Sequence, residues 1–76
     1  MNKSDEVQTR AKIRQQVNRI PAADLYSQFN KARLHQRYLY NHGTDDQLDE
    51  YEENRIRIEE IAKRYRQYMK KRMTCR

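Results

Sequence analysis

The chain has 76 residues, a formal net charge of +6, and only one glycine, one proline and one cysteine. A chain of this length forms one small domain, residues 1–76, whose hydrophobic core contributes little stability on its own. The single cysteine, Cys75, excludes an intramolecular disulfide framework, and no apolar run is long enough for a membrane span or a signal sequence. We therefore expect a soluble, cytoplasmic (intracellular) protein without a membrane span.

The first predicted helix covers residues 5–19. Ser4 is a suitable N-cap, and acidic side chains lie in the first turn, near the positive end of the helix dipole. Ile13 and Val17 belong to a narrow apolar stripe with helical spacing. Pro21 ends this helix, because the residue before a proline is biased toward an extended backbone.

The second predicted helix covers residues 22–41, since Pro21 fits the first position of a helix. One stripe carries Leu25, Phe29 and Ala32, whereas Leu34 and several tyrosines lie on other faces. A helix with two apolar faces packs between two neighbours. We therefore expect the second helix to lie between the first and the third.

The third predicted helix covers residues 45–72. Thr44 and Gln47 have the spacing of a capping box, and Gly43 suits the left-handed residue that ends a preceding helix. The short connection favours antiparallel packing of the second and third helices. At ~1.5 Å per residue, the third helix should extend about two turns beyond the second. The predicted fold is all-α, with three helices, an antiparallel helical hairpin and a long C-terminal helix.

An aromatic stripe follows the third helix at a seven-residue repeat, with a polar gap at Asn54 and Arg55. Ile56 lies nearly opposite, among carboxylates, and is expected to be exposed. Tyrosine suits a contact that is apolar at one end and wet at the other. The predicted protein interface is Tyr51, Ile58, Ile61, Tyr65, Tyr68 and Met69. Because aliphatic residues are scarce, we expect a homodimer or a protein partner to complete the fold.

Residues 61–76 carry seven basic side chains and no acidic one. Such a cluster attracts phosphate backbones and other polyanions. The predicted polyanion-binding residues are Lys63, Arg64, Arg66, Lys70, Lys71 and Arg72. The alternative is a solvated helix end whose cations only complement the helix dipole.

The second helix carries a further basic segment with interleaved aromatic residues. Arginine has donors suited to base edges, and tyrosine can stack on bases. The candidate base contacts are Lys31, Arg33, Arg37 and Tyr38. The alternative is that these residues pair with Asp45, Asp49 and Glu50 across the hairpin.

Catalytic patterns are missing from the sequence. The carboxylates cluster on one face of the third helix, where we expect them to be solvated, and His35 and His42 lack further metal ligands at suitable spacing. No cofactor or metal is expected. The sequence predicts a small non-enzymatic, basic regulatory or adaptor protein that binds another protein. The alternative is a nucleic-acid-binding regulator that uses the basic end of the third helix and the basic, aromatic second helix.

Overall fold

The computed structural model describes the backbone of residues 3–74 and the side chains of residues 5–71. This part of the chain contains three α-helices and no strand. They are α1 (Lys3–Asn18), α2 (Leu25–His42) and α3 (Leu48–Thr74). Short 3-10 helices, η1 (Ala22–Asp24) and η2 (Asp45–Gln47), lead into α2 and α3. The predicted all-α fold with three helices is confirmed.

The helix starts follow local capping chemistry. Pro21 has an extended backbone, with φ −58° and ψ 143°, immediately before η1. Thr44 and Gln47 form the expected capping box, in which the Thr44 backbone N–H donates to Gln47 Oε1 at 3.1 Å. The two helix starts predicted at residues 22 and 45 are therefore 3-10 turns that continue directly into α2 and α3.

The expectation for Gly43 is wrong. Its backbone is extended, with φ −69° and ψ 151°, and not left-handed. A glycine fits for a different reason, because a Cβ atom here would overlap the carbonyl oxygen of Leu39. The Gly43 N–H donates to that same oxygen at 2.8 Å, so the chain leaves α2 by passing close to its last turn.

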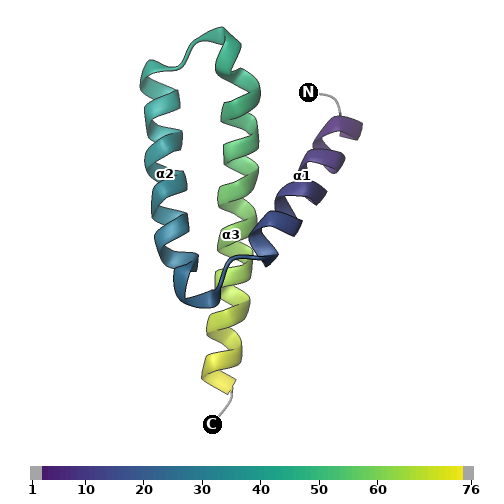
Figure 1. The fold of residues 1–76 in the computed structure, drawn as a ribbon, viewed down its shortest axis with the longest axis vertical. Helices are drawn as coiled ribbons and strands as arrows, with labels where there is room; N and C mark the ends of the chain where they lie inside the picture. The colour runs from purple at the N-terminus through teal and green to yellow at the C-terminus, as the bar shows by residue number, and fades with distance from the viewer. Residues whose placement is uncertain (1–2, 75–76) are drawn as a thin grey trace.

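The long helix α3 is the centre of the fold. Both α1 and α2 pack against α3 and make little contact with each other, as Figure 1 shows. The expectation that the second helix lies between the other two is therefore wrong. The physical reason is that α3 buries two different faces, whereas the second apolar face of α2, which includes Leu34, stays exposed.

The two partners of α3 run in opposite directions. Along α2 the residue numbers rise while those of the contacting residues on α3 fall. Tyr26 contacts Tyr65, Ala32 contacts Asn54, and His35 contacts Glu50. The α2–α3 hairpin is thus antiparallel, and α1 descends at an incline on the other side of α3 (Figure 1). The C-terminal end of α3 extends past the start of α2 in the same view.

One hydrophobic cluster joins the three helices. Its buried members are Ile13, Val17, Leu25, Ala32, Ile56 and Ile61. The expected exposure of Ile56 is wrong, because this side chain is fully buried in the cluster. Among the described residues, no helix combines the length and the apolar character that a membrane crossing requires.

Candidate functional site

The polar gap in the stripe of α3 is a buried link between helices. Asn54 is only 3% exposed. Its Nδ2 donates to the backbone carbonyl of Ala32 at 2.8 Å and to Gln36 Oε1 at 2.9 Å. Both acceptors lie on α2, so Asn54 holds α2 and α3 at one relative position along their length.

A cluster of ion pairs joins α1 to the other side of α3. Arg10 contacts Glu60 at 3.1 Å and Glu59 at 3.0 Å, and Arg14 contacts Glu60 at 3.3 Å. Glu60 is 5% exposed, so the expectation that the carboxylates of α3 are solvated is wrong for this residue. Burial alone would raise the pKa of Glu60, but hydrogen bonds from Arg14 and Arg10 outweigh it and leave the pKa below its ordinary value.

Arg55, on α3 itself, adds further ion pairs to this cluster. Arg55 contacts Glu52 at 3.0 Å and Glu59 at 2.9 Å, and it lies 3.9 Å from Glu6 of α1. The hydrogen bond that Arg55 donates to Glu52 raises the pKa of the guanidinium above its usual value. Among the described residues, the carboxylates on this side of α3 are therefore joined in a network of ion pairs.

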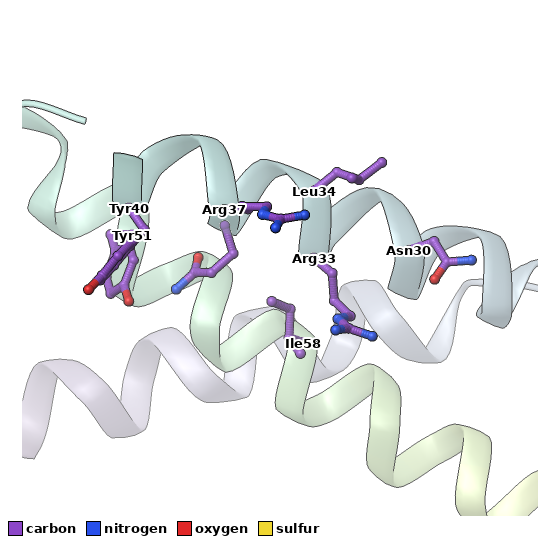
Figure 2. Close-up of a pocket in the computed structure, with 8 residues that line it drawn as sticks. Asn30, Arg33, Leu34, Arg37, Tyr40, Tyr51 and Ile58 are labelled. Carbon is purple, nitrogen blue, oxygen red and sulfur yellow. The ribbon is translucent and has the colours of Figure 1, made fainter. Parts of the chain in front are cut away.

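An open groove lies between α2 and α3, which we call the hairpin groove. Its cavity of about 820 Å³ is lined by Asn30, Arg33, Leu34, Gln36, Arg37, Tyr40, Tyr51 and Ile58. Figure 2 shows Arg33 reaching from α2 toward α3, with Ile58 directed toward α2. Leu34 lies at the outer rim and points away from α3, and Tyr40 and Tyr51 line the same end of the groove.

A smaller cavity of about 270 Å³ continues the hairpin groove toward the start of α2. It is lined by Tyr26, Phe29, Ala62, Tyr65 and Arg66. Positions 26, 30, 33, 37 and 40 fall on one stripe of α2, and positions 51, 58, 62 and 65 fall on one stripe of α3. The two cavities therefore lie on the same face of the hairpin. The term hairpin groove refers below to both cavities together.

The hairpin groove has basic walls. Arg33 and Arg37 are exposed, and neither has an ion pair among the described residues. Arg33 lies over the Phe29 ring, 5.7 Å from its centroid. The alternative pairing of the second helix with the acidic start of α3 is seen only for His35 within the described residues, where Nε2 is 2.9 Å from Glu50 Oε1. None of the residues that line the groove is acidic.

The predicted interface residues divide into three groups. Tyr51, Ile58 and Tyr65 are half-buried and line the hairpin groove, whereas Ile61 is fully buried in the core. Tyr68 and Met69 are half-buried and line neither cavity. Sequence reasoning missed Leu34 and Tyr40 as part of this surface. Their signal was present in the second apolar face of the helix, which was assigned to packing against another helix of the same chain.

The predicted polyanion-binding residues are distributed over several environments. Arg64 donates to the carbonyl of Val17 at the end of α1, and Lys63 lies 3.9 Å from Glu60. Arg66 is exposed and lines the hairpin groove. Lys70 and Lys71 are also exposed, and they follow Tyr65, whose ring lies beside that of Tyr26 in the first turn of α2. The side chain of Arg72, together with Cys75 and Arg76, lies outside the described residues.

The remaining candidate base contacts do not gather into one site. Lys31 and Tyr38 are exposed on α2 and line neither cavity, and the Tyr38 ring lies 5.4 Å from the His42 ring. Within residues 3–74, no group of three or more His, Cys, Asp or Glu side chains is placed to hold a metal ion. No protein-family model matches the chain, and comparisons with curated proteins and with solved structures found no match either.

Proposed function

We propose that this protein is a small, non-enzymatic adaptor or regulator that binds another protein through the hairpin groove. The observation that carries the proposal is the exposure of Leu34 (67%) and Tyr40 (77%) beside two arginines that have no ion pair among the described residues. Tyrosine and arginine are the residue types that most often dominate binding energy in protein interfaces. Apolar side chains gathered in a groove mark contact surfaces, whereas single scattered ones do not.

A matched pair of substitutions tests this function. Leu34→Asp places a charge at the rim of the hairpin groove, whereas Val7→Asp places one on α1 at a position with nearly the same exposure, 68%. Both variants should keep wild-type helicity, because both sites face solvent. A pull-down from nuclease-treated native lysate should recover the same partner with wild type and Val7→Asp and lose it with Leu34→Asp. Equal recovery with both variants would contradict the groove as the binding site.

The second candidate function is nucleic-acid binding by the basic end of α3. The observation in its favour is that α3 continues past the start of α2 (Figure 1). Lys70 and Lys71, which follow the contact between Tyr65 and Tyr26, are exposed, as is Arg66 at the end of the hairpin groove. Counterion release would give binding to duplex DNA a log–log salt slope of about −0.9 for each phosphate neutralised. Fluorescence anisotropy with a labelled duplex between about 50 and 200 mM salt measures that slope.

The control for this candidate removes the same charge elsewhere. Arg66→Gln/Lys70→Gln should flatten the slope by about 0.9 for each phosphate that is no longer neutralised, whereas Lys12→Gln/Arg19→Gln on α1 and just beyond it should not. Glutamine keeps the helix intact because its helix propensity is close to that of lysine and arginine. An equal effect of the two double variants would show that binding depends only on the net charge of the chain and not on the basic end of α3.

A further inference from the structure

We infer that the hairpin groove receives an acidic amphipathic α-helix of the partner protein. This inference rests on the proposed protein-binding function and specifies the chemistry of the partner. Two antiparallel helices with a shallow channel between them accept a third helix, whose apolar stripe fills the channel. The identity of the occupant follows from the shape, the apolar spacing and the charge of the groove.

The shape suits a helix of about four turns. On α2 the groove runs from Tyr26 to Tyr40, which is about 21 Å at ~1.5 Å per residue. On α3 it runs from Tyr51 to Arg66, one residue more. An extended peptide would leave its backbone N–H and C=O groups unpaired against helices, whereas a helical peptide satisfies them internally.

Large side chains recur at seven-residue spacing along the groove. On α3 they are Tyr51, Ile58 and Tyr65, and on α2 Tyr26 and Tyr40 stand seven residues before and after Arg33, with Phe29, Leu34 and Ala62 between these positions. A seven-residue repeat is the spacing at which helices pack side by side over several turns. The matching occupant carries large apolar residues at positions i, i+3 or i+4, and i+7.

The charge of the groove selects an acidic occupant. Arg33, Arg37 and Arg66 lie along its walls, and none has an ion pair among the described residues. A second copy of this chain is a poor occupant, because two molecules of charge +6 repel each other. A partner helix with glutamate or aspartate beside its apolar stripe would instead pair with the arginines as binding removes water from around them.

Three synthetic peptides of sixteen residues test the inference. Each carries leucines at helical i, i+3 and i+7 spacing, with flanking positions filled by glutamate, glutamine or lysine. Titrated into the isotope-labelled chain, the glutamate peptide should bind most tightly and shift the amide signals of groove residues. Arg33→Gln/Arg37→Gln should weaken the glutamate peptide about tenfold, as expected for two partly desolvated ion pairs. The same variant should leave the glutamine peptide unchanged, and Lys12→Gln/Arg19→Gln should alter neither.

Three results would overturn the inference. The first is a glutamate peptide that binds no more tightly than the lysine peptide or is insensitive to Arg33→Gln/Arg37→Gln. The second is a single-stranded oligonucleotide that shifts the same groove signals and displaces the glutamate peptide, which would make the groove a nucleic-acid site. The third is a dimer in sedimentation equilibrium that Leu34→Asp dissociates, which would make a second copy the occupant. If the peptides fail while Leu34→Asp still abolishes capture of the partner protein, the adaptor function stands and only the acidic helix is wrong.

Discussion

Asn54 and Glu60 are the two buried polar residues among those whose side chains the structure describes, and each is satisfied by a different helix. Asn54 donates to α2, whereas Glu60 accepts from arginines of α1. A buried polar group without partners costs free energy, so each of these residues favours the one arrangement in which its partners are present. Two residues less than two turns apart on α3 thus define where both neighbouring helices lie.

We predict that removing the donor of Asn54 destabilises the fold. Asn54→Asp should lower the free energy of unfolding most, because its carboxylate would face the carbonyl of Ala32 and Gln36 Oε1, both acceptors. Asn54→Ala should cost about 1–3 kcal/mol, and the exposed control Asn30→Ala should stay within about 0.5 kcal/mol. Urea unfolding followed by circular dichroism measures the three values. An Asn54→Asp variant as stable as wild type would show that the hydrogen bonds of Asn54 do not contribute to the free energy of unfolding.

We predict that Glu60 makes the stability depend on pH in the acid range. Its folded pKa lies below the ordinary value, so its contribution is full above the unfolded carboxyl pKa of about 4.3 and is lost as the pH falls through the folded value. Glu60→Gln should therefore be less stable than wild type at neutral pH and should lose less stability on acidification. Thermal unfolding between about pH 7 and pH 3 tests this. The exposed control Glu53→Gln should follow the wild-type curve, and a Glu60→Gln curve parallel to wild type would contradict the prediction.

At the scale of elements, the connections are short and depend on specific local contacts. The α2–α3 connection relies on the capping box of Thr44 and Gln47 and on the close passage of Gly43 over the last turn of α2. The last turn of α1 contains no basic residue, and the guanidinium of Arg64 supplies a donor to the Val17 carbonyl there. A cation at the C-terminus of a helix also suits its dipole, so α3 caps α1 from outside.

We predict that Gly43→Ala destabilises the hairpin although its backbone angles are accessible to any residue. The added Cβ would overlap the Leu39 carbonyl oxygen, and the chain must move away from a backbone atom to accept it. The expected cost is about 1–3 kcal/mol, similar to other overpacking substitutions. Thermal denaturation compares this variant with Asn41→Ala, an exposed position two residues earlier, which should change little. A Gly43→Ala variant of unchanged midpoint would show that the connection relaxes without cost.

At the scale of the whole molecule, α3 forms one interface with α2 and another with α1. α2 and α3 form a hairpin along most of the length of α2, whereas α1 is inclined (Figure 1) and, among its described side chains, buries only Ile13 and Val17, both in its second half. In a chain of 76 residues the total stability is small, so the less covered helix opens first. The hairpin groove lies on the α2–α3 unit and does not depend on α1 for any of its lining residues.

We predict that the amides of α1 exchange with solvent faster than those in the middle of α2 and α3. Val17→Ala, at a core position, should increase exchange in α1 more than in the hairpin, because it removes part of the apolar contact of α1. Val7→Ala, at an exposed position on the same helix, should leave exchange unchanged. Native-state hydrogen exchange read by NMR resolves the individual amides. Equal protection of all three helices would show that the chain opens only as one unit.

The local part of this structure could be predicted from the sequence. Pro21, the Thr44–Gln47 capping box and the helical spacing of apolar residues act within a few neighbouring positions, so they determined three helices, their ends and the basic end of α3. The aromatic stripe also predicted Tyr51, Ile58 and Tyr65 as protein-interface residues. The structure places them along the hairpin groove, and their contact with a partner stays a prediction.

Only the tertiary structure decided which helix lies in the centre and which side chains are buried. Periodicity shows that a helix has two apolar faces but not what covers each face. For this reason the sequence-based prediction placed the second helix between the other two, and it left Ile56 outside the core. The ion pairs of Glu60 join residues 46 and 50 positions apart, and no local spacing rule relates them. The groove likewise needs stripes from two helices at a fixed register, and that register depends on the buried Asn54 and on the close passage at Gly43.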